Sequence, residues 1–364
     1  MYRQRCSVVT RMGAVLILVG LMVACATPQR SAPAASPGQV QAGAPSALGE
    51  AAPAPAALES ITVVGSSPTE ISSLVWSLAI NLGYFRDVGL EPQFVSLPSA
   101  QMLAAVLTGD AQYAMDMTGH VSGLLEAHGT LPVRLLAVLA ARPQHAVLAQ
   151  PQYPSIAALK GRTLAVKAAG DTGHRAAKLL WQANGLDPVA DMHVLPIGTE
   201  QARLTAMQAG SVEAAVFTPP AIAMAQTLGY RMLGRASDVS NVPQSGVWTL
   251  GTRVEERPTE VVAVLRTLLR ALQFMHNPTN REVVLATINQ ALDVKDDAVA
   301  AGLYQGALDG LSTDGTVPAS GIQELIELQN AQRDTPVPLD PASFTDWGPL
   351  HTAQRDLAAA VRGR

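Results

Sequence analysis

Apolar positions along the chain fall into repeated units. Residues 102–118 read MLAAVLTGDAQYAMDMT, which predicts an amphipathic helix, a glycine that ends it, and a short apolar strand. Residues 203–219, RLTAMQAGSVEAAVFTP, predict the same three features in the same order. A shift of 101 positions aligns Leu103 with Leu204, Ala105 with Ala206, Gly109 with Gly210 and Ala114 with Ala215.

The similarity extends upstream. GLEPQFVSLPSAQ (89–101) resembles GLDPVADMHVLPIGTEQ (185–201), and each contains a Ser or Thr, Ser99 or Thr199, predicted to cap the next helix. A β-rich run followed by small residues occurs in both 61–70 and 162–173. Chance similarity in alanine-rich sequence is the alternative, but three segments agree in order. Each half therefore predicts strand, helix, strand, helix, strand, which is typical of parallel α/β lobes with ligand loops at the strands' carboxyl ends.

The first 58 residues have a different character. Residues 1–24 combine three arginines with an apolar stretch too short for a membrane span, which predicts a signal peptide. Met22-Val23-Ala24-Cys25 resembles a bacterial lipobox and predicts lipidation of Cys25; the alternative is an ordinary signal peptide in which Cys25 is incidental. Residues 25–58 are rich in Ala, Pro, Ser and Gly, so we expect a disordered, lipid-anchored linker.

Composition excludes several classes of function. Cys6 and Cys25 are the two cysteines, so a processed domain would lack thiol nucleophiles, thiol ligands and disulfides. Loss of the three arginines in residues 1–24 would lower the formal net charge from −4 to −7, which argues against nucleic-acid binding. The seven histidines form no His-x-x-x-His or Glu-x-x-His pair, so no metal site is expected.

Several segments resemble one known family in order. They are NLGYFRDVGLEPQFV, AQMLAAVLTGDAQYAM, ALKGRTLAVKAAGDTGHRAAKLLWQANGLDP and MQAGSVEAAVFTPPAIAMAQTLGYRML, within residues 60–275. They are similar to extracytoplasmic solute-binding proteins of ABC importers, in the nitrate/sulfonate/taurine and pyrimidine-precursor class. The resemblance implies a two-lobed, type II periplasmic-binding-protein fold around a hinged cleft. Lobe one would be 59–145 and 245–364, and lobe two 146–244.

The tripeptide Asp-Thr-Gly at 171–173 raises three possibilities. An aspartic protease needs a second such loop, and a phosphate-binding Walker loop needs a Gly-Lys-Ser/Thr sequence; both are missing. The remaining interpretation is a helix N-terminus at the cleft, where Gly170, Asp171 and Thr172 contact a ligand or simply cap the helix.

Other candidates occupy matching loops, and each has a plain structural alternative. Asp116 and Thr118 form a turn or receive a hydrogen-donating ligand group, and an aromatic at Phe217 stacks on a flat ligand or lies in the core. The family resemblance suggests that Trp76 faces the cleft. The predicted ligand-binding residues are Ser66, Ser67, Trp76, Ser99, Asp116, Thr118, Gly170, Asp171, Thr172, Phe217, Thr218 and Trp248.

These observations predict a monomeric, lipid-anchored extracytoplasmic receptor that delivers a small organic ligand to an ABC permease. The ligand would be a sulfonate, a nitrate-like anion or a pyrimidine or aromatic compound. We expect no catalysis and no cofactor. Two alternatives stay open: a pyrimidine-precursor synthase-like enzyme using pyridoxal phosphate, and a ligand-sensing subunit of a signalling receptor.

Overall fold

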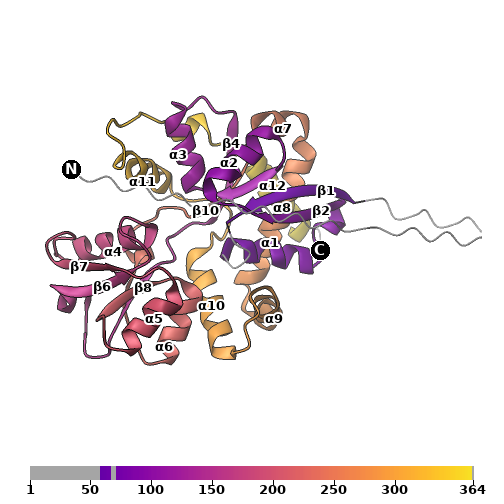
Figure 1. The fold of residues 1–364 in the computed structure, drawn as a ribbon. Helices are drawn as coiled ribbons and strands as arrows, with labels where there is room; N and C mark the ends of the chain where they lie inside the picture. The colour runs from indigo at the N-terminus through magenta and orange to yellow at the C-terminus, as the bar shows by residue number, and fades with distance from the viewer. Residues whose placement is uncertain (1–57, 67–70, 363–364) are drawn as a thin grey trace, which may run out of the picture. The chain divides into compact units, whose positions relative to one another are not determined.

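The computed structural model describes residues 58–66 and 71–362 of the 364-residue chain (Figure 1). All of them belong to one compact unit, Pro55–Arg364. The predicted signal peptide, Cys25, linker residues 26–57 and Ser67 lie outside the described residues.

Sheet A has the strand order β2-β1-β3-β10-β4. β1 is parallel to β2 and β3, whereas β10 is antiparallel to β3 and β4. In this register, Val64 of β1 lies opposite Val95 of β2 and Ala114 of β3. The strand bounds are β1 Glu59–Gly65, β2 Leu90–Ser96, β3 Tyr113–Asp116, β4 Val133–Ala140 and β10 Ser245–Leu250.

Sheet B repeats this arrangement with the order β7-β6-β8-β5-β9. β6 is parallel to β7 and β8, and β5 is antiparallel to β8 and β9. The bounds are β5 Ala146–Ala149, β6 Arg162–Val166, β7 Met192–Pro196, β8 Ala214–Phe217 and β9 Arg231–Arg235. The two strand orders correspond position by position, so the predicted duplication and the two-lobed α/β fold are confirmed.

Helices follow the parallel strands in both sheets, as βαβ units require. Gly109 and Gly210, the aligned glycines after the second helix of each repeat, both have positive φ, 81° and 69°, which a residue without Cβ adopts at little cost. The bounds are α1 Ile71–Asn81, α2 Ser99–Thr108, α3 Thr118–Glu126, α4 Thr172–Ala183, α5 Glu200–Gln208 and α6 Pro219–Thr227.

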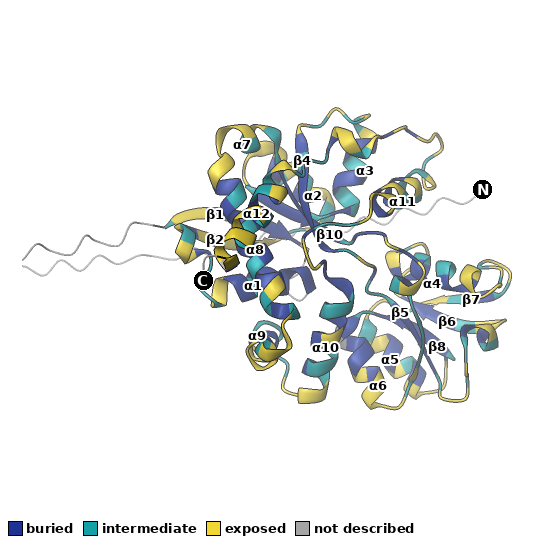
Figure 2. Cartoon of the chain, turned by 180° about the vertical axis from the view of Figure 1, so that it is seen from behind, coloured by how far each residue is buried: buried dark blue, intermediate teal, exposed yellow. Residues whose placement is uncertain are grey.

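The apolar strands are buried between layers of helices. Figure 2 shows buried strands in both sheets and helices whose outward sides are exposed. Separate hydrophobic clusters cover the two faces of sheet A, with Val63 in one and Val64 in the other, because successive side chains of a strand alternate between faces. Sheet B has its own two clusters, which contain Leu164 and Ala165 respectively.

The chain passes between the sheets twice. Residues 141–145 connect β4 to β5, and residues 236–244 connect β9 to β10. These two crossovers are joined to each other and to sheet A: the Ala236 amide donates to the His145 carbonyl at 2.8 Å, and the Gln244 amide donates to the Ala140 carbonyl at 2.8 Å. The crossovers are therefore a natural place for a hinge.

The C-terminal helices pack mainly against sheet A and its helices. Helix α8 contacts α1 and α12. Its apolar residues at intervals of four and three positions, which share one face of a helix, are all buried: Val261, Leu265, Leu268, Leu272 and Met275. Helix α11 contacts α3, while α10 contacts both α9 and α6. The bounds are α7 Gly251–Glu256, α8 Pro258–His276, α9 Arg281–Leu292, α10 Asp297–Gly310, α11 Ala319–Asn330 and α12 Gly348–Arg362.

Candidate functional site

Asp116 organises the loops at the carboxyl ends of the sheet A strands. Its carboxylate accepts hydrogen bonds from the Ser99 hydroxyl at 3.1 Å and from the Gly119 amide at 2.5 Å. The second bond is favourable because the first amides of α3 carry partial positive charge. The prediction that Ser99 caps α2 is wrong: Pro98 is the N-cap residue without a side-chain bond, and the Ser99 hydroxyl is turned toward Asp116.

The GDTG turn of lobe two caps helix α4, and its polar groups bond to one another. Asp171 is the N-cap of α4 and accepts the His174 amide at 2.7 Å. Gly170 has a φ of 81°; its amide donates to His174 Nδ1 at 2.8 Å, and its carbonyl accepts from the Arg175 guanidinium at 2.7 Å. Burial lowers the pKa of His174, with Lys178 acting in the same direction, so the imidazole is neutral and its Nδ1 can accept.

The loops after β7 and β8 are joined by a second set of hydrogen bonds. Thr199 caps α5 by accepting the Ala202 amide at 3.1 Å, as predicted. The Thr218 amide and hydroxyl both donate to Glu200 Oε1, at 2.8 and 2.9 Å. Arg203 donates to the carbonyls of Val216, Ile197 and Gly198 and lies 3.6 Å from Glu200. These bonds fix the ends of β7 and β8 against the helices that follow them.

The three aromatic candidates are buried in the hydrophobic core. Trp76 is 2% exposed and stacks on Phe85 with ring centroids 5.3 Å apart. Phe217 is fully buried in a sheet B cluster, and Trp248 is fully buried between His120 and Phe344. Because none of the three presents an accessible face, we leave them out of the proposed site.

One cavity brings both lobes and both crossovers together. The cavity itself has a volume of about 40 Å³, within about 450 Å³ of space that includes open solvent. Of the predicted residues it includes Thr118, the first residue of α3, and Thr172, the first residue of α4. Arg175 and His145 add polar groups, and Leu325 and Leu328 of α11 add an apolar wall. The full lining is Thr118, Pro143, His145, Thr172, Arg175, Ala176, Leu179, Ala236, Ser240, Val242, Gln244, Leu325, Leu328 and Gln329.

The other non-aromatic predicted residues that the structure describes are not part of this cavity lining. They are Ser66, which is exposed after β1, together with Ser99, Asp116, Gly170, Asp171 and Thr218. Sequence reasoning missed His145, Gln244 and the α11 residues as site candidates. The crossovers carried a usable signal, because the predicted lobe boundaries fall at 145 and 244; α11 carried none, because its approach to α4 is a tertiary contact.

His145 is a neutral group in the first crossover between the sheets. Its Nε2 lies 3.4 Å from the Thr172 hydroxyl, and its ring is close to Gly173, where an added Cβ would lie 3.3 Å from the imidazole. Burial lowers the pKa of His145 to about 4; Arg203 and Arg175 also lower it, whereas Asp171 opposes them. The cavity therefore contains a neutral imidazole and one guanidinium near neutral pH.

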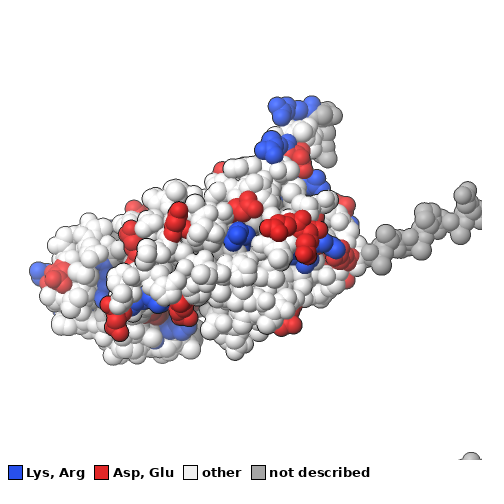
Figure 3. All heavy atoms as spheres, turned by 90° about the horizontal axis from the view of Figure 1, so that it is seen from above, with Lys and Arg blue, Asp and Glu red and all other residues white. Residues whose placement is uncertain are grey.

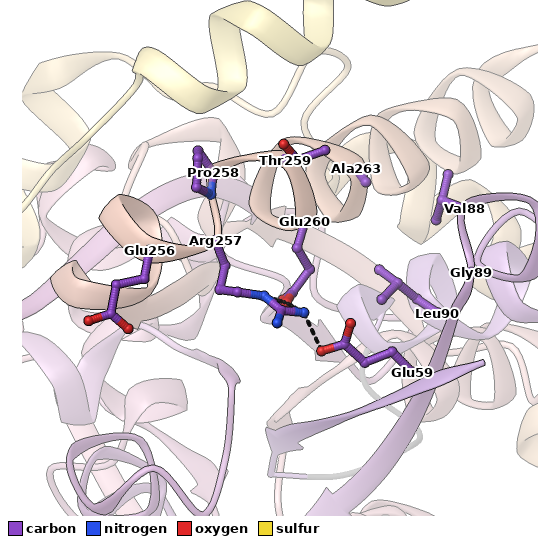
Figure 4. Close-up of a pocket in the computed structure, with 10 residues that line it drawn as sticks. All are labelled: Glu59, Val88, Gly89, Leu90, Glu256, Arg257, Pro258, Thr259, Glu260 and Ala263. Carbon is purple, nitrogen blue, oxygen red and sulfur yellow. Dashed lines mark hydrogen bonds and ion pairs between the residues drawn. The ribbon is translucent and has the colours of Figure 1, made fainter. Parts of the chain in front are cut away.

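A second, more open cavity of about 390 Å³ lies at the amino end of β1 (Figure 4). Figure 4 shows Arg257 between Glu59 and Glu260. Arg253 holds both oxygens of the buried Glu260, at 2.7 and 2.8 Å, and the Tyr113 hydroxyl donates to Glu260 at 2.9 Å. Because these charged groups satisfy one another, we assign them a structural role at the N-terminus of α8.

Other site types find no support in the described part of the chain. Across residues 58–66 and 71–362, no three or more His, Cys, Asp or Glu side chains are grouped so as to hold a metal ion. None of the helices found there has both the length and the apolar character that a membrane span requires. On the face shown in Figure 3, Lys and Arg are interspersed with Asp and Glu over a largely uncharged surface.

Solved structures share this fold. A putative periplasmic sulfonate-binding protein from Methylobacillus flagellatus KT is 16% identical, with a TM-score of 0.65 over 83% of this chain and 95% of that one. The periplasmic nitrate-binding protein NrtA from Synechocystis PCC 6803 is 12% identical, with a TM-score of 0.61 over 84% and 90%. The desulfurization enzyme DSZB is 17% identical, with a TM-score of 0.58 over 82% and 99%.

No curated protein matches the sequence closely enough to count as a relative. The family described as NMT1/THI5 like matches residues 73–281, which is more than half of the chain and includes both sets of parallel strands apart from β1. The chain therefore belongs to the NMT1/THI5-like family, and its two-lobed fold is that of periplasmic sulfonate- and nitrate-binding proteins.

Proposed function

We propose that this protein is a solute-binding lipoprotein that captures a small organic ligand between its lobes and delivers it to an ABC importer. The observation that carries the proposal is the cavity shared by Thr118 of lobe one, Thr172 of lobe two and both crossovers. A ligand bound there contacts each lobe and the hinge at once, so binding favours a closed arrangement. Family membership and the sulfonate- and nitrate-binding structural neighbours support the same function.

The ligand-binding part of the proposal has a direct test. Full-length protein in detergent is screened by thermal shift against taurine, alkanesulfonates, nitrate, aromatic acids and pyrimidines. A ligand at 100 times its Kd stabilises the folded state by about 2.7 kcal/mol. Binding of the hit must weaken in Thr172→Val and change in Arg175→Gln, while the exposed controls Thr227→Val and Arg231→Gln leave it unchanged. A hit insensitive to both site variants places the ligand elsewhere.

The proposed location is extracytoplasmic, with residues 1–24 as a signal peptide, Cys25 as the lipidated residue and residues 25–58 as the linker. Metabolic labelling with a fatty-acid analogue tests this directly. We expect label and membrane association in the wild type and loss of both in Cys25→Ser, with Cys6→Ser as the matched control. Label that persists in Cys25→Ser contradicts the anchor.

An enzyme is the second candidate, because the desulfurization enzyme DSZB has the same fold. The chain's cysteines, Cys6 and Cys25, both precede the described residues, so the lobes themselves contribute no thiol. Pyridoxal phosphate chemistry would require a Schiff base on a lysine such as Lys160, Lys167 or Lys178. Visible absorbance after addition of pyridoxal phosphate distinguishes the two: the receptor proposal expects no Schiff-base band, and a band would favour the enzyme.

A further inference from the structure

The cavity shared by the two lobes is small. Its volume of about 40 Å³ compares with about 300–1,000 Å³ for sites that hold drug-sized ligands. An organic ligand therefore enters between the lobes only if they separate. Besides the crossovers, lobe two contacts lobe one where α6 packs on α10 (Figure 1). The way in which α10 is attached to each lobe decides what must part when the lobes open.

Helix α10 is anchored in lobe one. One face of the helix, which includes Leu303, belongs to the hydrophobic cluster that covers one side of sheet A. On the same face, the Tyr304 hydroxyl donates to the Met275 carbonyl of α8 at 3.1 Å. At the C-terminal end of α10, the Gly310 carbonyl accepts the Ala141 amide of the first crossover at 2.9 Å. These contacts keep α10 with sheet A when lobe two moves.

Another face of α10 has glycines four residues apart, Gly302, Gly306 and Gly310, and we call it the glycine face. A Cβ on Gly302 would lie 2.5 Å from Ala223 Cβ of α6, and a Cβ on Gly306 would lie 3.2 Å from Pro219 Cβ. Both distances are shorter than ordinary contacts, so the absence of side chains is what lets α6 approach this closely. Gly302 is about 12 Å along the helix from Gly310, which lies at the first crossover. The glycine face therefore runs outward from the crossovers along lobe two.

An ion pair joins lobe two to α10 at the end next to the crossovers. Arg235, the last residue of β9, lies 2.8 Å from Asp309, and the two side chains are 30% and 37% exposed. Gln305 donates to the other Asp309 oxygen at 2.9 Å, which orients the carboxylate. Charge and close packing thus connect lobe two to α10 independently of each other.

We propose that α10 is the fixed surface on which lobe two closes. In the closed arrangement α6 lies on the glycine face, and opening lifts α6 from Gly302 and Gly306 while the crossovers bend. Glycine has no side chain to repack, so the two helices part and meet again without rotamer changes on α10. Arg235 and Asp309 are close to the crossovers, where the movement is smallest, and they hold the inner end of the contact. The fit of α6 to the glycine face then sets the closed population, and with it the apparent affinity for any ligand held between the lobes.

Spin labels and pulsed electron paramagnetic resonance measure this movement without a ligand. Cys6 and Cys25 both precede the lobes, so a full-length Cys6→Ser/Cys25→Ser chain carries labels only where cysteines are introduced. The pair Gln208→Cys of α5 and Ala298→Cys of α10 reports the distance between lobe two and α10. The pair Ala298→Cys and Gln273→Cys of α8 reports whether α10 stays with lobe one. All three labelled positions are exposed.

For the α5–α10 pair, Gly302→Ala should raise the ratio of open to closed molecules by about fivefold or more, because moving α6 away relieves the clash with Ala223. The double variant Ala223→Gly/Gly302→Ala should restore the original ratio. Asp309→Asn should raise the ratio by up to about fivefold, the effect of losing an exposed ion pair. Its matched control is Asp356→Asn, which breaks the ion pair with Arg266 of α8 inside lobe one and should leave the ratio unchanged.

The α8–α10 distance should be the same in every variant. A longer α8–α10 distance in Gly302→Ala means that α10 leaves lobe one together with α6, which overturns the proposal, as does an unchanged α5–α10 ratio. If the melting temperature shows that Gly302→Ala does not fold, the ion pair decides: Arg235→Asp should open the lobes and Arg235→Asp/Asp309→Arg should close them again. An unchanged ratio in both of these variants overturns the proposal. Because the experiment uses no ligand, its result is independent of the receptor function proposed above.

Discussion

Sheets A and B have the same strand order, yet the loops at their carboxyl ends differ in charge. In lobe two, Asp171 accepts an amide of α4, Glu200 accepts the amide of Thr218 before α6, and each carboxylate has an arginine nearby. In lobe one, the Asp116 carboxylate lies beside His120, a buried histidine whose ring nitrogens have no hydrogen-bond partner. The backbone framework is common to both repeats because strand pairing and helix packing depend on apolar periodicity. The loop side chains do not take part in that packing, so the two halves can carry different chemistry on one framework.

The lobes also differ in how they contact the C-terminal helices. Sheet A receives the C-terminal helices, and the N-terminus of α8 brings the charged network of Glu260, Arg253, Arg257 and Glu59 against the start of β1 (Figure 4). Lobe two reaches these helices through α6, which packs on α10. Arg235 of β9 strengthens that contact by pairing with Asp309 at 2.8 Å. The C-terminal helices therefore connect the two lobes in addition to the crossovers.

The largest loss of stability that we expect comes from the charged network around Glu260 in lobe one. Glu260→Ala removes the partner of Arg253, Arg257 and Tyr113 from a buried site. Breaking a buried charged pair on one side costs about 3–5 kcal/mol. Urea unfolding measures the loss, with the exposed Glu255→Ala as the control. If Glu260→Ala lowers the unfolding free energy by less than the loss of an exposed ion pair would, the network contributes little to the stability of lobe one.

Contact between the lobes through α10 gives the next effect. A Cβ on Gly302 would lie 2.5 Å from Ala223 Cβ of α6. Gly302→Ala should therefore destabilise the folded protein by about 1–3 kcal/mol despite the higher helix propensity of alanine. The double variant Ala223→Gly/Gly302→Ala removes the clash and should recover stability. Thermal unfolding of both variants measures this, and an unchanged or stabilised single variant would show that α10 and α6 are free to separate.

Acidification should destabilise the folded protein through His145. Its pKa of about 4 is below the ordinary value of 6.5, so between these pH values the unfolded chain binds a proton that the folded chain does not. The neutral ring makes its whole contribution to the free energy of unfolding above pH 6.5, and this contribution falls as the pH drops toward 4. We expect a loss of about 1–2 kcal/mol, reduced by partial exposure. Urea titrations at pH 7 and 4.5 should show a smaller pH effect in His145→Gln, and the wild-type pH effect in the exposed control His193→Gln.

The smallest effect distinguishes Thr199 and Ser99, the hydroxyl residues at the starts of α5 and α2. Thr199→Ala removes a helix cap and should cost about 1 kcal/mol. Ser99→Ala removes no cap, because its hydroxyl bonds Asp116, and should cost about half as much. Equal losses in urea unfolding would mean that the two loops contribute to stability in the same way despite their different bonding.

The amino-acid sequence by itself determined the repeated framework, the glycine-terminated helices and the core face of α8. These features depend on local periodicity and on residues, such as Gly109 and Gly210, whose conformational preference is intrinsic. It also placed Thr118 and Thr172 at strand ends, where the structure puts them on one cavity.

Only the tertiary structure decided which side chains reach that cavity. Trp76 lies on a helix that is apolar around most of its circumference, and Trp248 lies on a strand covered on both faces, so no pattern showed that both are core residues. The contribution of α11 to the cavity and the ion pair between Arg235 and Asp309 depend on contacts between distant segments. Burial and charge balance are properties of the packed molecule, because they depend on which groups exclude water from one another.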